Sequence, residues 1–236
     1  MQNSSLLSGK NTQVSRWQSF NTQEELNKAA ANYVVKSAEN AIASRGRFIV
    51  ALAGGTTPKS VYELLQSINT DWTKWHIYYG DERCLSPDHA DRNSLMAEQA
   101  WLNHVAIPAT QIHPIPAELG SKKGAAAYAE TLAGLDFDLV LLGLGEDGHT
   151  ASLFPGEVWD DGSATVSVDN APKPPPERVS VSASKLSAAQ EVLFMVSGAG
   201  KQQAVNDWRT GVPIPASAIT PKNGVDVYCY GVKVAA

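Results

Sequence analysis

His149 is the residue of this chain best suited to moving a proton. It stands in the glycine-rich segment GLGEDGHTAS at 143–152, whose glycines free the backbone to wrap around a ligand. Asp147, two positions earlier, can orient or polarise the imidazole, and an imidazole near its ordinary pKa can take a proton from water at neutral pH. The alternative is a purely structural histidine, which the position of the segment after an apolar run disfavours. We therefore predict that His149 and Asp147 belong to a catalytic site.

Two other glycine-rich turns have the features of anion-binding sites. The first consists of Gly54, Gly55, Thr56 and Thr57. Its glycines let the backbone approach a ligand, and the helix that follows presents free N–H groups. It lacks the sequence of a P-loop or a dinucleotide fingerprint, so a nucleotide is not implied. The second turn ends at Lys201, where the lysine and a helix dipole both favour a phosphate. A threonine-capped turn and a solvated lysine are the plain alternatives.

A charged loop, GDER at 80–83, follows another strand-like run. It contains Asp81, and Arg83 can form a forked pair with a phosphate or a carboxylate. The alternative is an exposed charged turn. Ligands of open α/β sheets bind at the carboxyl ends of the strands, so we expect this loop and the three glycine-rich segments to meet in one cleft.

Strand-like and helix-like patterns alternate between these loops. Thr22 and Glu25 have the spacing of a helix capping box, and Thr56 or Thr57 can cap a second helix with Pro58 at its start. Alternation of this kind predicts an α/β fold with an open, mostly parallel sheet and helices on both faces. Strands are expected at 47–53, 75–79, 111–114, 137–142, 178–182, 191–196 and 225–230, and further helices at 93–102, 123–132 and 200–208.

The predicted domain organisation is simple. Residues 1–21 are polar and are expected to be a frayed lead-in, and residues 22–236 are expected to form one catalytic domain. The proline-rich stretch Pro172–Pro176 lies within the polar run 157–177, where it cannot be regular helix or a central strand. We expect this run to be a surface excursion, and whether it closes over a substrate is open.

Composition excludes several classes of function. A formal net charge of -5 provides no basic field for nucleic acid, and no apolar run approaches the roughly 20 residues needed to cross a membrane. Cys84 and Cys229 form no C-x-x-C pair, which favours a reduced, cytoplasmic setting. The five histidines lack zinc-site spacings, so no metal is expected. We expect a monomer or weak oligomer.

Four motifs, taken together, resemble the 6-phosphogluconolactonase family. They are ALAGGTTP at 51–58, GDER at 80–83, LLGLGEDGHTASLFPG at 141–156 and VSGAGK at 196–201. The resemblance spans the chain from about Thr22 to its C-terminus. It implies a Rossmann-like three-layer fold similar to that of glucosamine-6-phosphate deaminase. It also implies hydrolysis of 6-phospho-D-glucono-1,5-lactone to 6-phospho-D-gluconate in the oxidative pentose phosphate pathway, without metal or organic cofactor.

The resemblance also implies roles for individual residues. His149 matches the proposed general base that draws a proton from water, and Asp81 and Asp147 match acidic neighbours whose division of labour is open. Asn93 matches a family asparagine, although it follows Arg92 where serine is more usual. The positions associated with the substrate's phosphate are Arg83, Lys201 and the turn of Gly54, Gly55, Thr56 and Thr57.

Two other functions are compatible with parts of the sequence. Glucosamine-6-phosphate deaminase shares the fold and the Asp-Gly-His core, but it has a glutamate five positions after the histidine, where this chain has Phe154. That glutamate takes part in ring opening, so its absence favours the lactonase. A non-catalytic sugar-phosphate sensor would need a DNA-reading module, and no helix-turn-helix pattern or basic patch precedes Thr22.

Overall fold

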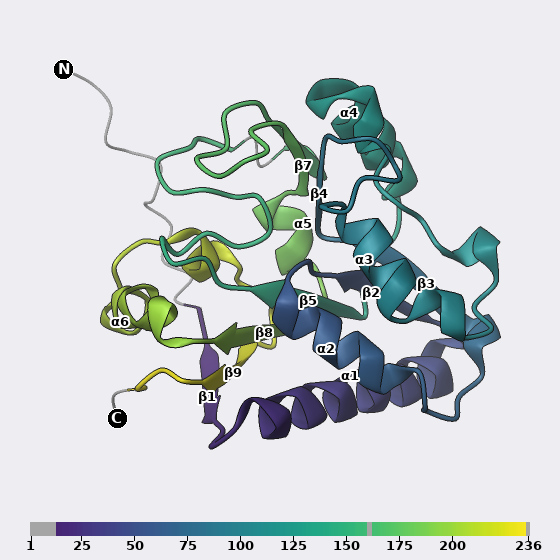
Figure 1. Cartoon of the computed structure of the whole chain (residues 1–236), viewed down its shortest axis with the longest axis horizontal. Coiled ribbons are helices and arrows are strands. Elements are labelled where there is room, and N and C mark those ends of the chain that lie inside the picture. Colours follow the sequence, from purple (N-terminus) through teal and green to yellow (C-terminus); the bar gives the residue numbers. More distant parts are fainter. Residues whose placement is uncertain (1–12, 160–161, 235–236) are drawn as a thin grey trace.

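A parallel sheet forms the centre of the molecule (Figure 1). The computed structural model describes residues 13–159 and 162–234, and within them the strands form a six-stranded sheet and a separate three-stranded sheet. The large sheet has the order β1-β9-β8-β5-β2-β3, and each neighbouring pair is parallel. Its strands are β1 (Ser15–Ser19), β2 (Phe48–Leu52), β3 (Trp75–Tyr79), β5 (Leu139–Gly143), β8 (Glu191–Ser197) and β9 (Val225–Tyr230).

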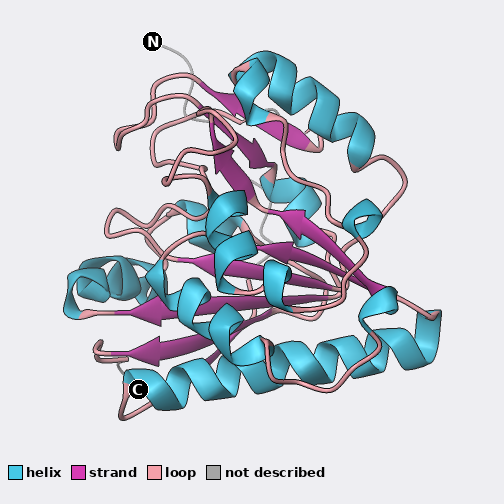
Figure 2. Ribbon diagram, turned by 45° about the vertical axis from the view of Figure 1, so that its right-hand side comes forward, coloured by secondary structure: helices cyan, strands magenta, loops and turns pink. Residues whose placement is uncertain are grey.

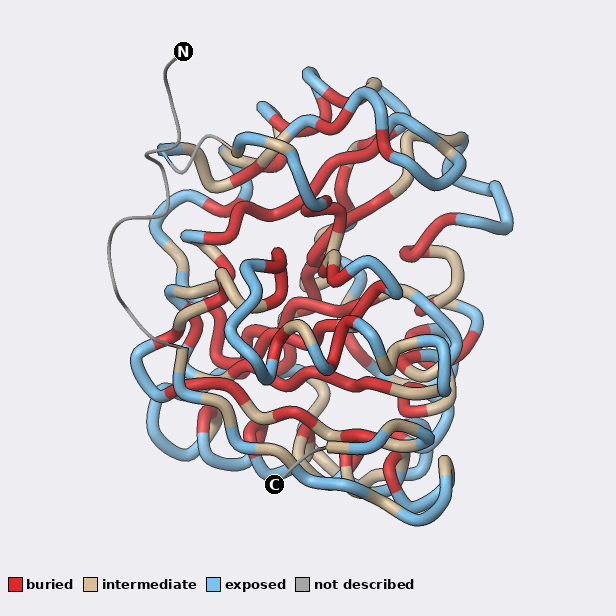
Figure 3. Tube along the Cα trace, turned by 90° about the vertical axis from the view of Figure 1, so that its left-hand side faces the viewer, coloured by how far each residue is buried: buried red, intermediate tan, exposed pale blue. Residues whose placement is uncertain are grey.

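The most apolar runs occupy the middle of this sheet. β2 reads Phe-Ile-Val-Ala-Leu, and all five residues are buried, as expected of a strand covered on both faces. The edge strand β1 is mostly polar, and its Trp17 packs edge-on against Trp208 with ring centroids 5.1 Å apart. The neighbouring strands β5 and β8 are buried except at their ends, and buried chain occupies the interior of the molecule (Figure 3).

The prediction of a frayed lead-in over residues 1–21 is wrong for Ser15–Ser19. Residues 1–12 lie outside the described residues, but Ser15–Ser19 are not frayed, because they pair with β9 as an edge strand of the sheet. A five-residue strand with a single large apolar side chain gives too weak an alternating pattern to be recognised from sequence.

Helices cover both faces of the large sheet, which confirms the predicted architecture (Figure 2). Tyr228 of β9 contacts Tyr33 at 6.0 Å between ring centroids, whereas Phe194 of β8 contacts Trp208 at 4.8 Å. Phe194 is paired with Val227, the neighbour of Tyr228, so the two contacts lie on opposite faces. The helices are α1 (Gln23–Arg45), α2 (Thr56–Leu65), α3 (Asn93–Ala100), α4 (Ser121–Thr131), α5 (Ala183–Ser187) and α6 (Gln202–Thr210).

The predicted N-cap of α1 is confirmed, because Thr22 Oγ1 accepts a hydrogen bond from the Glu25 amide at 3.1 Å. The reciprocal bond of a capping box is displaced by one residue, since the Glu25 carboxylate accepts from the Asn21 amide at 2.9 Å and not from that of Thr22. The start of α2 differs from the prediction. Its N-cap is Gly55, at φ 107°, without a side-chain cap, so neither threonine hydroxyl is used there.

A small antiparallel sheet departs from the predicted topology. β4 (Asp81–Arg83), β7 (Arg178–Val181) and β6 (Thr165–Val168) stand in that order beside α4 (Figure 1). The alternating pattern predicted that 178–182 would join the parallel sheet, but residue patterns do not encode the partner of a buried strand. β6 also lies within the run predicted to be a surface excursion. The strand predicted at 111–114 is reduced to an isolated bridge between Ile112 and Ile77.

Candidate active site

A cleft of about 370 Å³ opens at the carboxyl ends of the central strands. The four loops predicted to converge all line it, which confirms that the fold brings them together. Their lining residues include Gly54, Gly55, Thr56, Thr57, Asp81, Arg83, Gly143, Gly145, His149, Ser197 and Lys201, and Asn93 lies among them. Asp147 is not among these lining residues, but it contacts His149, which is. The roles assigned to these residues stay predictions.

The imidazole of His149 is held by the carboxylate of Asp147. Nδ1 lies 2.5 Å from Asp147 Oδ1, and the His149 amide donates to the same oxygen at 3.2 Å. A carboxylate only accepts hydrogen bonds, so this contact assigns the proton to Nδ1 and leaves Nε2 as the basic nitrogen. Gly145 makes the approach possible, since a Cβ there would lie 2.0 Å from Nδ1.

Burial and the carboxylate have opposite effects on the histidine. Burial lowers the pKa of His149, while Asp147 acts to raise it, and the pKa lies below its ordinary value. For Asp147, burial raises the pKa but the hydrogen bonds with His149 lower it, so that it too lies below the ordinary value. The pair is therefore a neutral imidazole beside a carboxylate at neutral pH, which is the form a general base requires.

Phe154 contacts both the histidine and a cation. Its ring centroid lies 4.7 Å from that of His149, and the Arg178 guanidinium carbon lies 5.5 Å from the same centroid. Phe154 is buried with Val168 and Ala171 of the 157–177 run. An apolar ring thus stands beside the base, at the position where the deaminase pattern has a glutamate.

Asp81 forms the acidic side of the cleft. It is 6% exposed, its Oδ2 accepts from Ser152 Oγ at 2.6 Å, and its Oδ1 accepts from Asn93 Nδ2 at 3.1 Å. Asn93 Nδ2 also donates to the Asp81 carbonyl at 3.0 Å. A Cβ at Gly54 would lie 1.9 Å from Asn93 Oδ1, so the glycine lets the asparagine lie against the turn.

Cations from several elements line the same cleft. Within the described part of the chain these are Arg83, Lys173, Arg178 and Lys201. Arg83 Nη1 donates to the Asp91 carbonyl at 2.5 Å, and its buried Nε has no hydrogen-bond partner among the described residues. Burial lowers the pKa of Lys201, although Glu146 opposes this. Together with the free N–H groups of α2, these side chains can hold a phosphate.

Sequence reasoning missed Lys173 and Arg178. Arg178 donates to the carbonyls of Lys173 at 2.9 Å, Pro174 at 3.2 Å and Pro175 at 3.1 Å, and so folds the proline-rich stretch against the cleft. The useful signal was an arginine at the start of a strand, directly after a stretch rich in prolines that cannot donate backbone hydrogen bonds.

No group of three or more histidine, cysteine, aspartate or glutamate side chains in residues 13–159 and 162–234 is arranged to hold a metal ion. In the same residues, no helix has the length and apolar character needed to cross a bilayer. Cys84 and Cys229 are free thiols.

A histidine–aspartate pair and several cations at the strand ends of a parallel sheet define an α/β enzyme site for a small anionic substrate. A model of the family of glucosamine-6-phosphate isomerases and 6-phosphogluconolactonases matches residues 21–228. A 6-phosphogluconolactonase of Synechocystis is 42% identical over 178 residues, which cover 71% of this chain and 73% of that relative. One of Mycobacterium leprae is 36% identical over 221 residues, covering 84% and 88%.

Solved structures agree with this assignment. The 6-phosphogluconolactonase of Thermotoga maritima superimposes with a TM-score of 0.85 at 25% identity, over 92% of this chain and 100% of that chain. The enzyme of Trypanosoma brucei gives 0.83 at 26% identity, over 93% and 97%. The chain belongs to the family of glucosamine-6-phosphate isomerases and 6-phosphogluconolactonases, and its relatives place it among the 6-phosphogluconolactonases.

Proposed function

We propose that this chain hydrolyses 6-phospho-D-glucono-1,5-lactone to 6-phospho-D-gluconate in the pentose phosphate pathway. The relatives are named 6-phosphogluconolactonases, after this reaction, and the cleft has a base that can activate water and cations that can bind a phosphate. One observation carries the proposal: the basic nitrogen of His149, fixed by Asp147, lies in a cleft beside the apolar ring of Phe154. In the deaminase pattern, a glutamate stands at the position of Phe154.

The proposed reaction starts with His149 Nε2 taking a proton from water as the water oxygen attacks C1 of the lactone. The C1–O5 bond then breaks, and the imidazolium returns the proton to O5, which becomes the 5-hydroxyl. The new carboxyl group ionises and releases one proton to solvent. A δ-lactone is an activated ester, so a positioned water needs no covalent intermediate.

The carboxylates and cations have separate proposed roles. Asp147 fixes the tautomer of His149, and the negative charge of Asp81 supports the imidazolium formed during attack. Arg83 and Lys201 bind the phosphate, with the start of α2 at Gly55, Thr56 and Thr57. We add Lys173 and Arg178 to this set because they line the same cleft.

The assay must separate the lactonase from the deaminase. We expect the purified protein to release acid from freshly prepared 6-phosphogluconolactone faster than the lactone opens by itself, as followed in a pH-stat. Glucosamine 6-phosphate should yield no ammonia. Ammonia release without lactone hydrolysis would replace the proposal with the deaminase, and binding of sugar phosphates without either reaction would favour the sensor.

We also propose a cytoplasmic monomer or weak oligomer that acts on a small sugar phosphate and binds no nucleic acid. The free thiols support a reducing compartment, although a rice relative is named as chloroplastic. Analytical ultracentrifugation should give a monomer mass at micromolar concentration, and a stable dimer at that concentration would refute this part.

A further inference from the structure

A buried ion pair lies behind the acidic side of the cleft. Glu82 is 0% exposed and Arg92 is 2% exposed, and Arg92 Nε lies 3.2 Å from Glu82 Oε2. Neither side chain lines the cleft as the described residues define it. Buried ion pairs add little stability over apolar packing, because both charges must be removed from water. Net stability therefore does not explain the pair, and its role is sought in the groups that Glu82 and Arg92 bind.

Glu82 holds the start of α3. Its Oε1 accepts from the amide of Asn93 at 2.8 Å, and its Oε2 accepts from the amide of Ser94 at 2.8 Å. These are first-turn N–H groups, which have no partner within the helix. Arg92, at the N-cap position, makes no side-chain cap bond, so the carboxylate of Glu82 from β4, 11 positions before Asn93, caps the helix in its place.

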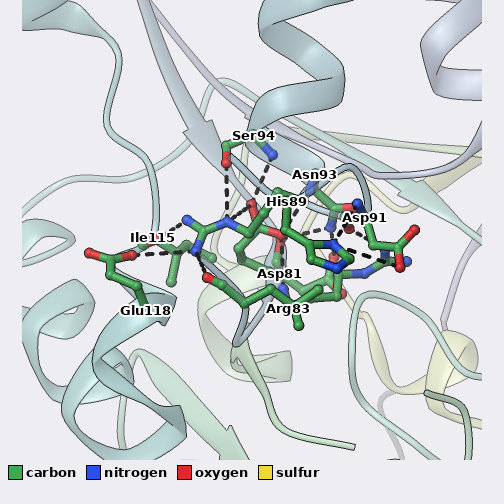
Figure 4. A network of polar contacts seen from close by, with 11 residues as sticks. Asp81, Arg83, His89, Asp91, Asn93, Ser94, Ile115 and Glu118 are labelled. Atoms are coloured by element: carbon green, nitrogen blue, oxygen red, sulfur yellow. Dashed lines mark hydrogen bonds and ion pairs between the residues drawn. The ribbon is translucent and has the colours of Figure 1, made fainter. Parts of the chain in front are cut away.

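The same carboxylate fixes two residues of the cleft. Asn93, held through its amide, reaches Asp81 with its side chain at 3.0 Å and 3.1 Å. Glu82 Oε1 also accepts from the amide of Arg83 at 2.8 Å. Figure 4 shows Asp81, Arg83, Asn93 and Ser94 gathered in this single network of polar contacts.

Arg92 ties the network to the surrounding structure. Its Nη1 donates to the Leu85 carbonyl at 2.9 Å and lies 3.3 Å from Glu118 Oε2, and its Nη2 donates to the Ile115 carbonyl at 3.0 Å. Ile115 and Glu118 lie together on one side of the network, away from Asn93 (Figure 4). Arg92 thus holds the Glu82 carboxylate on the side away from the cleft. The backbone amides that donate to this carboxylate belong to Arg83 and Asn93, which line the cleft, and to Ser94.

We propose that Glu82 is a positioning residue for lactone hydrolysis. It acts through Asn93 on the carboxylate of Asp81, and through the backbone amide on Arg83. This inference rests on the proposed function. A merely structural carboxylate would cap α3 and add stability, with no effect on turnover beyond the loss of folded protein.

A double-mutant cycle separates the two roles. Glu82→Gln, Asn93→Ala and the double variant are compared with the full-length wild type for kcat, KM and thermal stability. We expect each single change to lower kcat about 10- to 100-fold, because small misplacements of catalytic groups have effects of this size. The double variant should lose no more kcat than the worse single variant, since the effect of Glu82 on Asp81 passes through Asn93. Multiplicative losses, or an unchanged kcat in folded Glu82→Gln, would overturn the proposal.

Two further variants make the result interpretable. Glu118→Gln makes the same chemical change at another carboxylate beside Arg92, but among the described residues Glu118 makes no hydrogen bond or ion pair with Asn93, Asp81 or Arg83, and the kcat of this variant should stay at the wild-type value. If Glu82→Gln does not fold, Glu82→Asp keeps the charge and draws the carboxylate back, so its kcat should fall. Wild-type kcat in Glu82→Asp, or equal loss in Glu118→Gln, would refute the role of Glu82. A wild type without lactone turnover would instead refute the proposed function, and this inference with it.

Discussion

The histidine loop at 143–152 and the acidic loop at 80–83 each bring a carboxylate to the cleft, but they hold it in opposite ways. Asp147 contacts a residue two positions away, and its side chain is 34% exposed. Asp81 is buried and is held by Asn93 and Ser152, which lie 12 and 71 positions away. A local pair depends on its own loop, whereas a long-range set depends on the whole fold. Changes on the two sides should therefore have different consequences.

The largest expected effect lies on the histidine side. His149→Ala should lower kcat by about two to four orders of magnitude, because the reaction loses its general base. Binding of 6-phosphogluconate, measured by isothermal titration calorimetry, should change little because the cations remain. A variant with wild-type turnover would exclude His149 as the base.

Loss of a phosphate-binding cation comes next in size. Arg83→Ala or Lys201→Ala should weaken binding of 6-phosphogluconate by about 10- to 100-fold, which corresponds to one charge-assisted hydrogen bond. Steady-state kinetics should show the change mainly in KM. A large fall in kcat at unchanged KM would contradict the phosphate assignment of that residue.

The two carboxylates should differ in their effect on stability. Asp81→Asn should lower the free energy of unfolding by about 1–3 kcal/mol, because one buried acceptor of the Ser152 and Asn93 hydrogen bonds becomes a donor. Asp147→Asn should cost less, since its side chain is partly exposed. Urea denaturation measures the free energy of unfolding of both variants. An equal loss in the two would contradict the proposed difference between the buried and the partly exposed carboxylate.

The smallest expected effect is a shift of the pH profile. His149 must be neutral to act as a base, so its pKa sets the acidic limb of kcat/KM. Asp147 raises the pKa of His149, so Asp147→Asn should move that limb to lower pH, along with a lower maximum. Burial lowers the same pKa, so Phe154→Ala, which admits water, should move the limb to higher pH. Shifts in the same direction for both variants would contradict these assignments.

The difference between the loops also explains what the sequence could predict. The apolar runs, the N-cap at Thr22 and the pairing of His149 with Asp147 depend on residues close in sequence, and the structure contains each of them. Other features depend on residues that lie dozens of positions apart. They are the pairing of β4 with β7, the hydrogen bond from Ser152 to Asp81 and the place of Lys173 in the lining of the cleft. Pattern and spacing carry no information on such partners, so they predict the acidic side of the site only as loops expected to meet, and Asp81 and Asn93 are named individually through the family resemblance.

A structure of the protein with 6-phosphogluconate bound tests the account most directly. The phosphate should lie within hydrogen-bond distance of Arg83 and Lys201, and the C1 carboxylate, which derives from the lactone carbonyl, should face His149 Nε2. A ligand bound in the reverse orientation, with its phosphate against His149, would contradict the proposed mechanism.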